Sequence, residues 1–275
     1  MAHEESIRLA AFLGVFAIIA AWEFFSPRRR LTTSKVTRWV ANTAMTILGT
    51  VIVRWLYPVL AVTLAAGNST YGLLNYVVLP YSLKVLIGIL LLDWAIYGQH
   101  VLFHSVPLFW RLHMMHHADL DIDVTTGLRF HPIEIALSMG IKVGAVIIIG
   151  PPVLAVILFE VLLNGTSMFN HGNILMPAGV DRLLRLLVVT PDMHRVHHSV
   201  VIRETNSNFG FNFPWWDRLF NTYRDQPAAG HEKMTIGLSL YRDEKKLTLP
   251  RLLALPFTGK PGVYPILSKH KPREK

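Results

Sequence analysis

The sequence predicts an all-α protein, a multispanning membrane helical bundle of about three spans plus a helical hairpin, with a histidine-rich cap on the cytoplasmic side. Three observations predict this fold class. Hydrophobic residues make up 52% of the 275 residues and charged residues 16%, whereas an average soluble domain is about 25% charged. The apolar residues are concentrated in stretches of about 17 to 27 residues, long enough to cross a bilayer as helices. Ten of the 13 histidines fall in clusters between residues 100 and 198, beyond the third of these stretches.

The composition also excludes several classes of protein. The aliphatic and aromatic content excludes intrinsic disorder. The chain contains no cysteine, which excludes a disulfide scaffold, a thiolate metal site and a cysteine nucleophile. A metal ion in this protein must therefore be held by His, Asp or Glu.

The first apolar run covers residues 7–25. Its N-terminal flank is acidic, whereas a secretion signal would be basic, and a basic cluster of Arg28, Arg29, Arg30, Lys35 and Arg38 follows it. We interpret the run as a retained helix with its C-terminal end in the cytoplasm. The alternative is a signal peptide cleaved near Ala20-Ala21.

The second and third apolar runs cover residues 40–66 and 76–92, and the turn between them, residues 67–75, carries no charge. Three crossings that start outside end inside. The histidine-rich segment 93–132 is therefore expected on the cytoplasmic face, in agreement with the positive-inside rule.

The fourth apolar block, residues 133–169, is interrupted by Pro151-Pro152. Proline ends helices, and each half is short for a full span, so we expect a helical hairpin. Lys142 and Glu160 lie at similar distances from its tip, and we expect them to pair because an isolated charge at that depth is costly. The alternative is that each faces water separately.

The remaining residues are more polar. Residues 241–275 contain nine Lys or Arg and three Asp or Glu, and apolar residues lie between these charges. Such a basic tail suits the anionic cytoplasmic leaflet, and nucleic acid is a poor alternative for a tail tethered to a membrane domain. We divide the chain into N-terminal transmembrane helices (1–92), a histidine-rich domain (93–223) and the basic tail (224–275), integrated into one domain. The apolar residues of the tail are Leu252, Leu253, Leu255, Pro256 and Phe257.

Ten histidines fall in five clusters, with one HxxxH and two HxxHH patterns. On a helix the side chains at i+3 and i+4 lie on the same face as the side chain at i, but they are displaced to opposite sides of it. Three imidazoles in HxxHH are therefore spread too widely for one metal ion, but they suit two ions side by side. Neutral imidazole is a ligand for Fe, Zn, Cu and Ni. The ten are His100, His104, His113, His116, His117, His131, His171, His194, His197 and His198.

The histidine patterns and their flanking residues closely resemble the fatty acid hydroxylase, or sterol desaturase, superfamily over residues 93–223. Members of that superfamily are integral membrane proteins whose histidine boxes hold a diiron centre that activates O₂ to attack lipid C–H bonds. The motifs are DWAIYGQHVLFH (93–104), WRLHMMHH (110–117), RFHPIE (129–134), NH (170–171), PDMHRVHHS (191–199), NFG (208–210) and WDRLFNTY (216–223).

The resemblance implies that the histidines of the HxxxH and HxxHH patterns are the box ligands. His171 matches an additional family histidine, and His131 matches one found in many but not all branches. Val101 replaces a common Arg in the first box and Asn221 replaces the usual Gly near the end of the last motif. Neither change removes a ligand.

Ligating imidazoles usually donate their second N–H to a carboxylate or a carbonyl. Among the carboxylates near the boxes we expect Asp93 and Asp192 to be these partners, the alternative being helix capping or solvation. The other nearby carboxylates are Asp119, Asp121, Asp123, Glu134 and Asp217. Met114, Met115, Phe103 and Phe109 are candidates for the wall of a lipid tunnel, with core packing as the alternative.

We therefore predict a membrane-bound diiron oxygenase that hydroxylates or desaturates a lipid: a sterol, fatty acyl, carotenoid or alkyl lipid. It would use two Fe ions, O₂ and a separate electron donor, either a ferredoxin or a cytochrome with its reductase. The expected location is the bacterial inner membrane or the endoplasmic reticulum. The alternatives are a zinc-dependent membrane hydrolase, against which the absence of an HExxH motif counts, and a metal transporter, which would favour ionisable residues in mid-membrane.

Overall fold

The computed structural model describes residues 4–57, 61–67 and 71–268. Within these ranges the chain is helical and forms no strand, only two isolated bridges. Five segments are long and apolar enough to cross a membrane: α1 (Glu4–Phe25), the segment Lys35–Gly67 with α2 (Lys35–Leu56) and α3 (Ala61–Gly67), α4 (Tyr81–Ser105), α6 (Pro132–Ile149) and α7 (Val153–Asn170). The predicted fold class, a helical membrane bundle with a histidine-rich cap, is confirmed.

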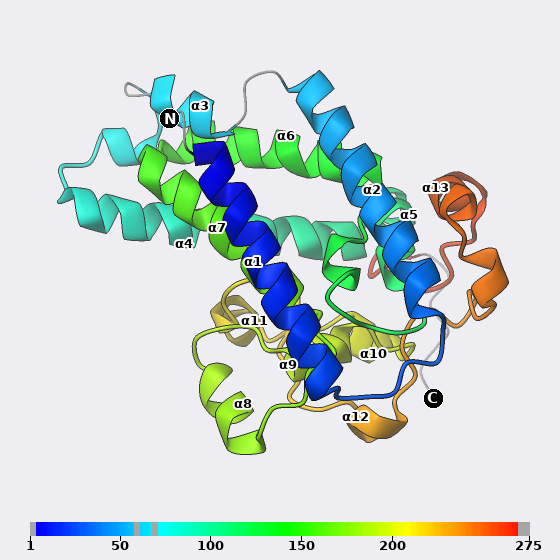
Figure 1. Ribbon diagram of the computed structural model, residues 1–275. Helices are drawn as coiled ribbons and strands as arrows, with labels where there is room; N and C mark the ends of the chain where they lie inside the picture. The colour runs from blue at the N-terminus through cyan, green and yellow to red at the C-terminus, as the bar shows by residue number, and fades with distance from the viewer. Residues whose placement is uncertain (1–3, 58–60, 68–70, 269–275) are drawn as a thin grey trace.

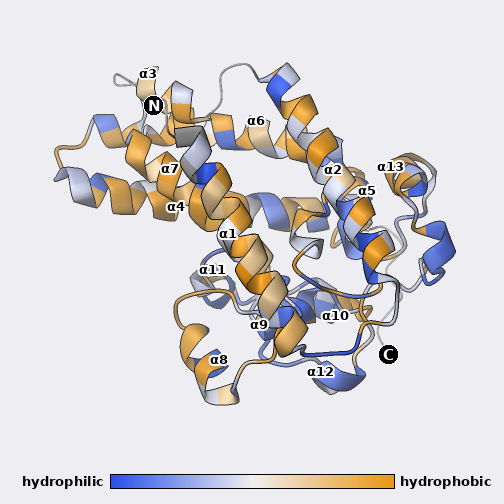
Figure 2. Ribbon diagram, in the orientation of Figure 1, coloured by the Kyte–Doolittle hydropathy of each residue, from blue (hydrophilic) through white to orange (hydrophobic). Residues whose placement is uncertain are grey.

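Long helices form one part of the molecule and short helices the other (Figure 1). Helix α4 packs against both α6 and α7, α1 packs against α7, and α2 packs against α6. Figure 2 shows that hydrophobic residues dominate these helices, whereas hydrophilic residues gather in the cap. The cap contains α5 (Pro107–His117), α8 (Ala178–Leu184), α9 (Pro191–His197), α10 (Ile202–Thr205), α11 (Trp215–Leu219), α12 (Gly230–Lys233), α13 (Leu249–Thr258) and the 3₁₀ turns η2 (Thr126–Leu128) and η3 (Glu244–Lys246).

The predicted hairpin is present as α6 and α7, each of 18 residues. Gly150 ends α6 in the left-handed conformation, with φ 62°, which glycine adopts without strain. The tip meets Gly72, just before the 3₁₀ turn η1 (Leu73–Asn75), so closely that a Cβ on Gly72 would lie 2.4 Å from the Cα of Gly150. The two glycines therefore hold the hairpin tip against the segment that leads into α4.

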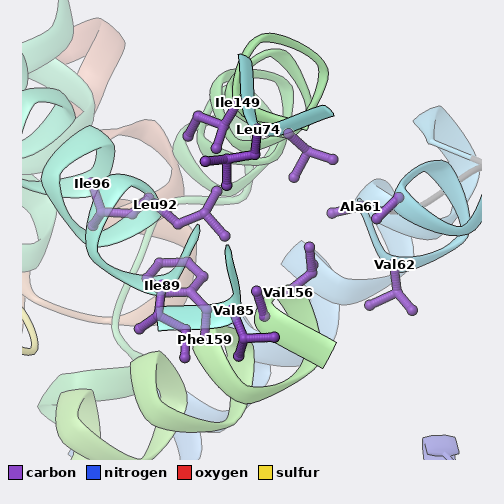
Figure 3. Close-up of a cluster of buried hydrophobic side chains, with 13 residues drawn as sticks. Ala61, Val62, Leu74, Val85, Ile89, Leu92, Ile96, Ile149, Val156 and Phe159 are labelled. Carbon is purple, nitrogen blue, oxygen red and sulfur yellow. The ribbon is translucent and has the colours of Figure 1, made fainter. Parts of the chain in front are cut away.

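The main apolar core lies between the long helices. Figure 3 shows its labelled side chains, with Leu92 of α4, Ile149 of α6 and Phe159 of α7 directed to a common centre. Phe159 is completely buried and Leu92 is 1% exposed. Burial of such a side chain stabilises the fold by about 1.5–3 kcal/mol, and this core fixes the helices that carry the first histidines.

The second apolar run, residues 40–66, belongs to one candidate membrane span but contains parts of two helices in the described residues. Helix α2 ends at Leu56, and Tyr57 adopts φ −122° and ψ 78°. Pro58 follows in the sequence, and a residue before proline is disfavoured in the helical conformation. A separate helix, α3, then begins at Ala61.

The charged residues of the hairpin pair as predicted. The Nζ of Lys142 lies 2.5 Å from Oε1 of Glu160, and Arg8 of α1 contacts the second carboxylate oxygen. Glu160 is 4% exposed, so two cations neutralise one buried carboxylate. This ion-pair network joins α1, α6 and α7.

We expect Glu160→Leu to lower the free energy of unfolding by about 3 kcal/mol, because it strands two cations, as is typical of breaking a buried ion pair. Lys142→Leu should cost less, since Arg8 still contacts Glu160. Thermal unfolding of the purified protein in detergent micelles measures both. Equal losses for the two variants would contradict the arrangement.

Three of the five apolar residues named in the basic tail are buried in the protein and so are not free to contact a membrane. Leu252, Leu255 and Pro256 of α13 are buried, and the two leucines pack in the cluster that also contains Trp110. Phe257, in contrast, is 63% exposed. Helix α13 packs against α5 through its apolar face. Leu252 and Leu255, which the sequence suggested for lipid contact, are therefore part of the protein core.

Candidate metal centre

Nine of the ten singled-out histidines converge in the interior of the cap. His100 and His104 lie in the last two turns of α4, the next three lie on α5, His171 caps α7, and the last three lie on or directly after α9. None of the nine is more than 4% exposed. Elements up to a hundred residues apart in the sequence thus contribute side chains to one site.

The nine imidazoles form two groups, within each of which one nitrogen per ring lies within 4.8 Å of all the others. Each HxxHH segment divides its rings between the groups, as the helical geometry predicts. The five-histidine group consists of His100, His104, His113, His117 and His197, and the four-histidine group of His116, His171, His194 and His198.

Facing Nε2 atoms are close in both groups. They are 3.2 Å apart in His100 and His113 and 3.1 Å apart in His104 and His117. In the four-histidine group the Nε2 of His171 lies 3.1 Å from that of His194 and 3.2 Å from that of His116. For metal–nitrogen bonds of about 2.1 Å these separations correspond to angles of about 95–100° at the metal. The spacing of the donors therefore fits a metal ion in each group.

Six of the rings are held by their Nδ1 atoms. In each case Nδ1–H donates to an oxygen that can only accept, which fixes the tautomer and turns the Nε2 lone pair toward the group. The pairs are His100 with Phe209 O (2.8 Å), His104 with Asn206 Oδ1 (3.1 Å), His113 with Glu134 Oε1 (2.6 Å), His116 with Arg129 O (3.1 Å), His171 with Ser167 O (2.7 Å) and His197 with Ser207 O (2.7 Å).

The motif after the last histidines positions several of these oxygens. Asp217 of α11 accepts hydrogen bonds of 2.8 Å from the backbone N–H groups of Phe209 and Gly210. Asn208, at φ 54°, donates to the carbonyl of Met193 on α9. The segment 206–210 is therefore fixed to both α9 and α11. This places the carbonyls of Ser207 and Phe209 within hydrogen-bond distance of the Nδ1–H groups of His197 and His100.

Burial determines the charge state of these imidazoles. Desolvation, reinforced by repulsion from neighbouring imidazoles, lowers the pKa of His116, His117, His194, His197 and His198 well below the ordinary value. Burial also lowers the pKa of His171, to about 4. The rings are therefore neutral at pH 7, the form that binds metals.

Several inward nitrogens lack a protein partner. Among the described residues, Nε2 of His197 and both ring nitrogens of His198 have no hydrogen-bond partner, although all three are buried. Buried polar atoms are almost always satisfied. The unpartnered nitrogens and the all-imidazole donor set both fit bound metal ions.

His131 is not part of either group. It is the N-cap of α6, where Nδ1 accepts from the N–H of Ile133 at 3.2 Å and Nε2 lies 3.2 Å from the carbonyl of Leu253. Both nitrogens are engaged by the backbone. The structure therefore gives His131 a capping role and not the place of a tenth ligand.

Asp93 and Asp192, the expected carboxylate partners, contact no histidine of the two groups. The indole N–H of Trp216 donates to Asp93 at 2.7 Å. Asp192, in the first turn of α9, instead pairs with Arg28 at 3.2 Å and with Arg195. Glu134, in contrast, accepts a hydrogen bond from Nδ1 of His113 in the five-histidine group.

A cavity of about 270 Å³ adjoins the five-histidine group. His100 and His113 line it, together with residues from α1, α2, α4, α6 and α7, and Phe103 forms part of its wall. Met114 and Met115 lie elsewhere: both are fully buried in the cluster around Trp110. Of the four suggested tunnel residues, Phe103 lines the cavity and Phe109 stacks on the ring of Phe103. The two methionines belong to the hydrophobic core.

We expect Asn206→Leu to weaken metal binding about 10–100-fold, the usual cost of losing a hydrogen-bond partner of a ligating imidazole. Asn206 Oδ1 is the acceptor for His104. Ser207→Ala is the matched control, because its backbone carbonyl still accepts from His197. Metal retention during titration with a chelator measures both, and identical retention would contradict the assignment.

A helical bundle with two buried, all-histidine groups is typical of metalloproteins with paired histidine sites. The chain belongs to the fatty acid hydroxylase family, whose model matches residues 85–222. The match includes all nine grouped histidines.

Curated relatives align over the same region. Ornithine lipid hydroxylase OlsE of Rhizobium tropici is 29% identical over 148 residues, 54% of this chain and 44% of the relative. Human alkylglycerol monooxygenase is 30% identical over 54% of this chain and 31% of its own length. The chain thus covers less than half the length of these relatives. No solved structure shows significant similarity to it.

Proposed function

We propose that this protein is a membrane-bound diiron oxygenase that hydroxylates or desaturates a lipid, using O₂ and externally supplied electrons. The observation that carries the proposal is the pair of adjacent, buried, all-histidine groups of five and four rings. Membership of the fatty acid hydroxylase family supports it. The relatives named a lipid hydroxylase and an alkylglycerol monooxygenase favour a lipid as the substrate.

The five-histidine group would hold one iron ion and the four-histidine group the other. Bound there, two iron ions would supply electrons to O₂ and the oxidising power needed to break an aliphatic C–H bond. The residues of the chain keep six of the nine rings in place through Nδ1 hydrogen bonds. Imidazole donors thus take the place of the carboxylates that hold two irons in soluble helical bundles.

The cavity beside the five-histidine group would receive the lipid. Most of its lining residues lie on helices that are long and apolar enough to span a membrane, which would let a lipid enter from the bilayer without crossing water. Exclusion of water from the cavity protects a reactive oxidant from side reactions.

The basic cluster Arg28, Arg29 and Arg30 after α1 supports placing the cap in the cytoplasm. The membrane would be a bacterial inner membrane or the endoplasmic reticulum. A cytoplasmic cap is accessible to a ferredoxin or a cytochrome with its reductase, which would deliver the electrons as a separate protein.

Lipid mass spectrometry of cells with and without the gene product tests the proposal. We expect products that are heavier by about 16 Da (one oxygen atom) for hydroxylation, or lighter by about 2 Da (two hydrogen atoms) for desaturation. Metal analysis of the purified protein is the companion measurement. Zinc with no oxidised lipid would favour a hydrolase, and metal flux into vesicles would favour a transporter; either result would overturn the oxygenase.

A further inference from the structure

The cavity beside the five-histidine group contains polar atoms as well as apolar wall. Since His100 and His113 line it, a molecule that fills it contacts the group directly. Most of its wall is aliphatic or aromatic, as an alkyl chain requires. Polar side chains also line it, and two of them carry buried oxygen atoms without a partner.

Glu134 supplies the first of these oxygens. The residue is 2% exposed, and its Oε1 accepts from Nδ1 of His113 at 2.6 Å. Its Oε2 is buried and has no hydrogen-bond partner in the described part of the chain. A carboxylate oxygen can only accept, so this atom requires a hydrogen-bond donor.

Gln99 supplies the second. Its amide Nε2 donates to the hydroxyl of Ser138 at 2.7 Å, which leaves Oε1 buried without a partner in the same described ranges. Gln99 directly precedes His100 on α4, and Ser138 lies one helical turn after Glu134 on α6, on the same face. Both residues line the cavity that Glu134 lines.

The charges around the cavity restrict what can meet these two acceptors. No Lys or Arg is among the described residues that line it, whereas Glu134 is. A carboxylate or phosphate group would find no Lys or Arg side chain to pair with among these residues, and Glu134 would repel it. A neutral hydroxyl could donate to either oxygen, and an amino group with two N–H donors could satisfy both.

We propose that Glu134 Oε2 and Gln99 Oε1 form a donor-recognition subsite. It would bind a hydroxyl or amino group of the lipid and hold the neighbouring carbon beside His100 and His113. The inference rests on the proposed function and narrows its substrate class. The substrate is a lipid with a hydrogen-bond donor within a few bonds of the oxidised carbon, and not a plain hydrocarbon chain or one entering by its carboxylate.

The test compares three probes of equal chain length: hexadecanol, hexadecyl methyl ether, which lacks the donor, and hexadecanoate. Each competes with radiolabelled hexadecanol for the full-length protein as purified, with its metal, in lipid nanodiscs without reductant. We expect hexadecanol to bind at least about tenfold more tightly than the other two, the effect of a hydrogen bond to a charged acceptor.

Two variants address the subsite separately. Gln99→Leu removes one acceptor, and Glu134→Gln keeps an oxygen for His113 while turning an amide N–H₂ toward the cavity. Since the hydroxyl donates to one acceptor at a time, at least one of the two variants should reduce the preference for hexadecanol over its methyl ether to about threefold or less. Thr50→Val is the matched control: Thr50 lines the same cavity, but its hydroxyl already donates to the Thr46 carbonyl, so the preference ratio should be retained.

Equal binding of the alcohol and the ether by the unaltered protein would overturn the subsite, as would an unchanged ratio in both Gln99→Leu and Glu134→Gln. The outcome is separable from the proposed function, because no turnover occurs without reductant. A tenfold preference with no oxidised lipid on adding reductant would overturn the function alone. Oxidised lipid without any preference would overturn the subsite alone.

Discussion

The His117→Ala and His198→Ala variants should each retain about one iron ion per chain in place of two. Each should also lose at least about a thousandfold in activity. This loss is larger than the roughly 10–100-fold effect of removing a residue that only hydrogen-bonds to a ligating imidazole. His117 belongs to the five-histidine group and His198 to the four-histidine group. One substitution therefore removes a donor from one ion and leaves the other group intact. Iron quantification and product formation are the measurements.

His131→Ala is the matched control for these variants. His131 is also a buried histidine, but it lies outside both groups and bonds to the backbone. We expect this variant to keep both iron ions. Full iron in His117→Ala or His198→Ala, or loss of iron in His131→Ala, would contradict the division into two groups.

The second large effect is expected at Arg38, which joins α2 to the loop after α5. Its guanidinium donates to both oxygens of Asp119, at 2.8 and 2.9 Å, and to Asp123 at 2.5 Å. Burial opposes ionisation of Asp119, but Arg38 and Arg129 outweigh it and lower the pKa of this carboxyl to about 2. Both aspartates are at most 3% exposed, so they depend on Arg38 for neutralisation.

We therefore expect Arg38→Leu to lower the free energy of unfolding by about 3–5 kcal/mol, the usual cost of leaving a buried charge unpaired. Arg30→Leu, which changes an exposed arginine of the same basic cluster, should change it by less than about 0.5 kcal/mol. Thermal unfolding in detergent micelles compares the two. Similar stability of both variants would show that the network contributes little.

Periodicity and spacing predicted the features that depend on local geometry. Pro151-Pro152 predicted the hairpin, because proline stops a helix wherever it falls. Lys142 and Glu160 were predicted to pair because similar distances from the tip place them side by side. The division of each HxxHH segment between two groups follows from the 3.6-residue turn.

The features that depend on tertiary contacts could not be read in the same way. Asp192 lies two residues before His194, yet a helix directs the two side chains to different faces, and Asp192 reaches Arg28. Glu134 is 21 residues from His113 in the sequence, and only the packing of α6 on α5 brings them together. His131 resembles a ligand in sequence, but its position directly before Pro132 makes it a helix cap.

Anomalous diffraction at the iron edge from crystals of the full-length protein tests the central claim most directly. Two peaks are expected, one enclosed by the five histidines that include His197 and one by the four that include His198. A single peak, a zinc signal in place of iron, or rings turned away from an ion-free interior would contradict the account.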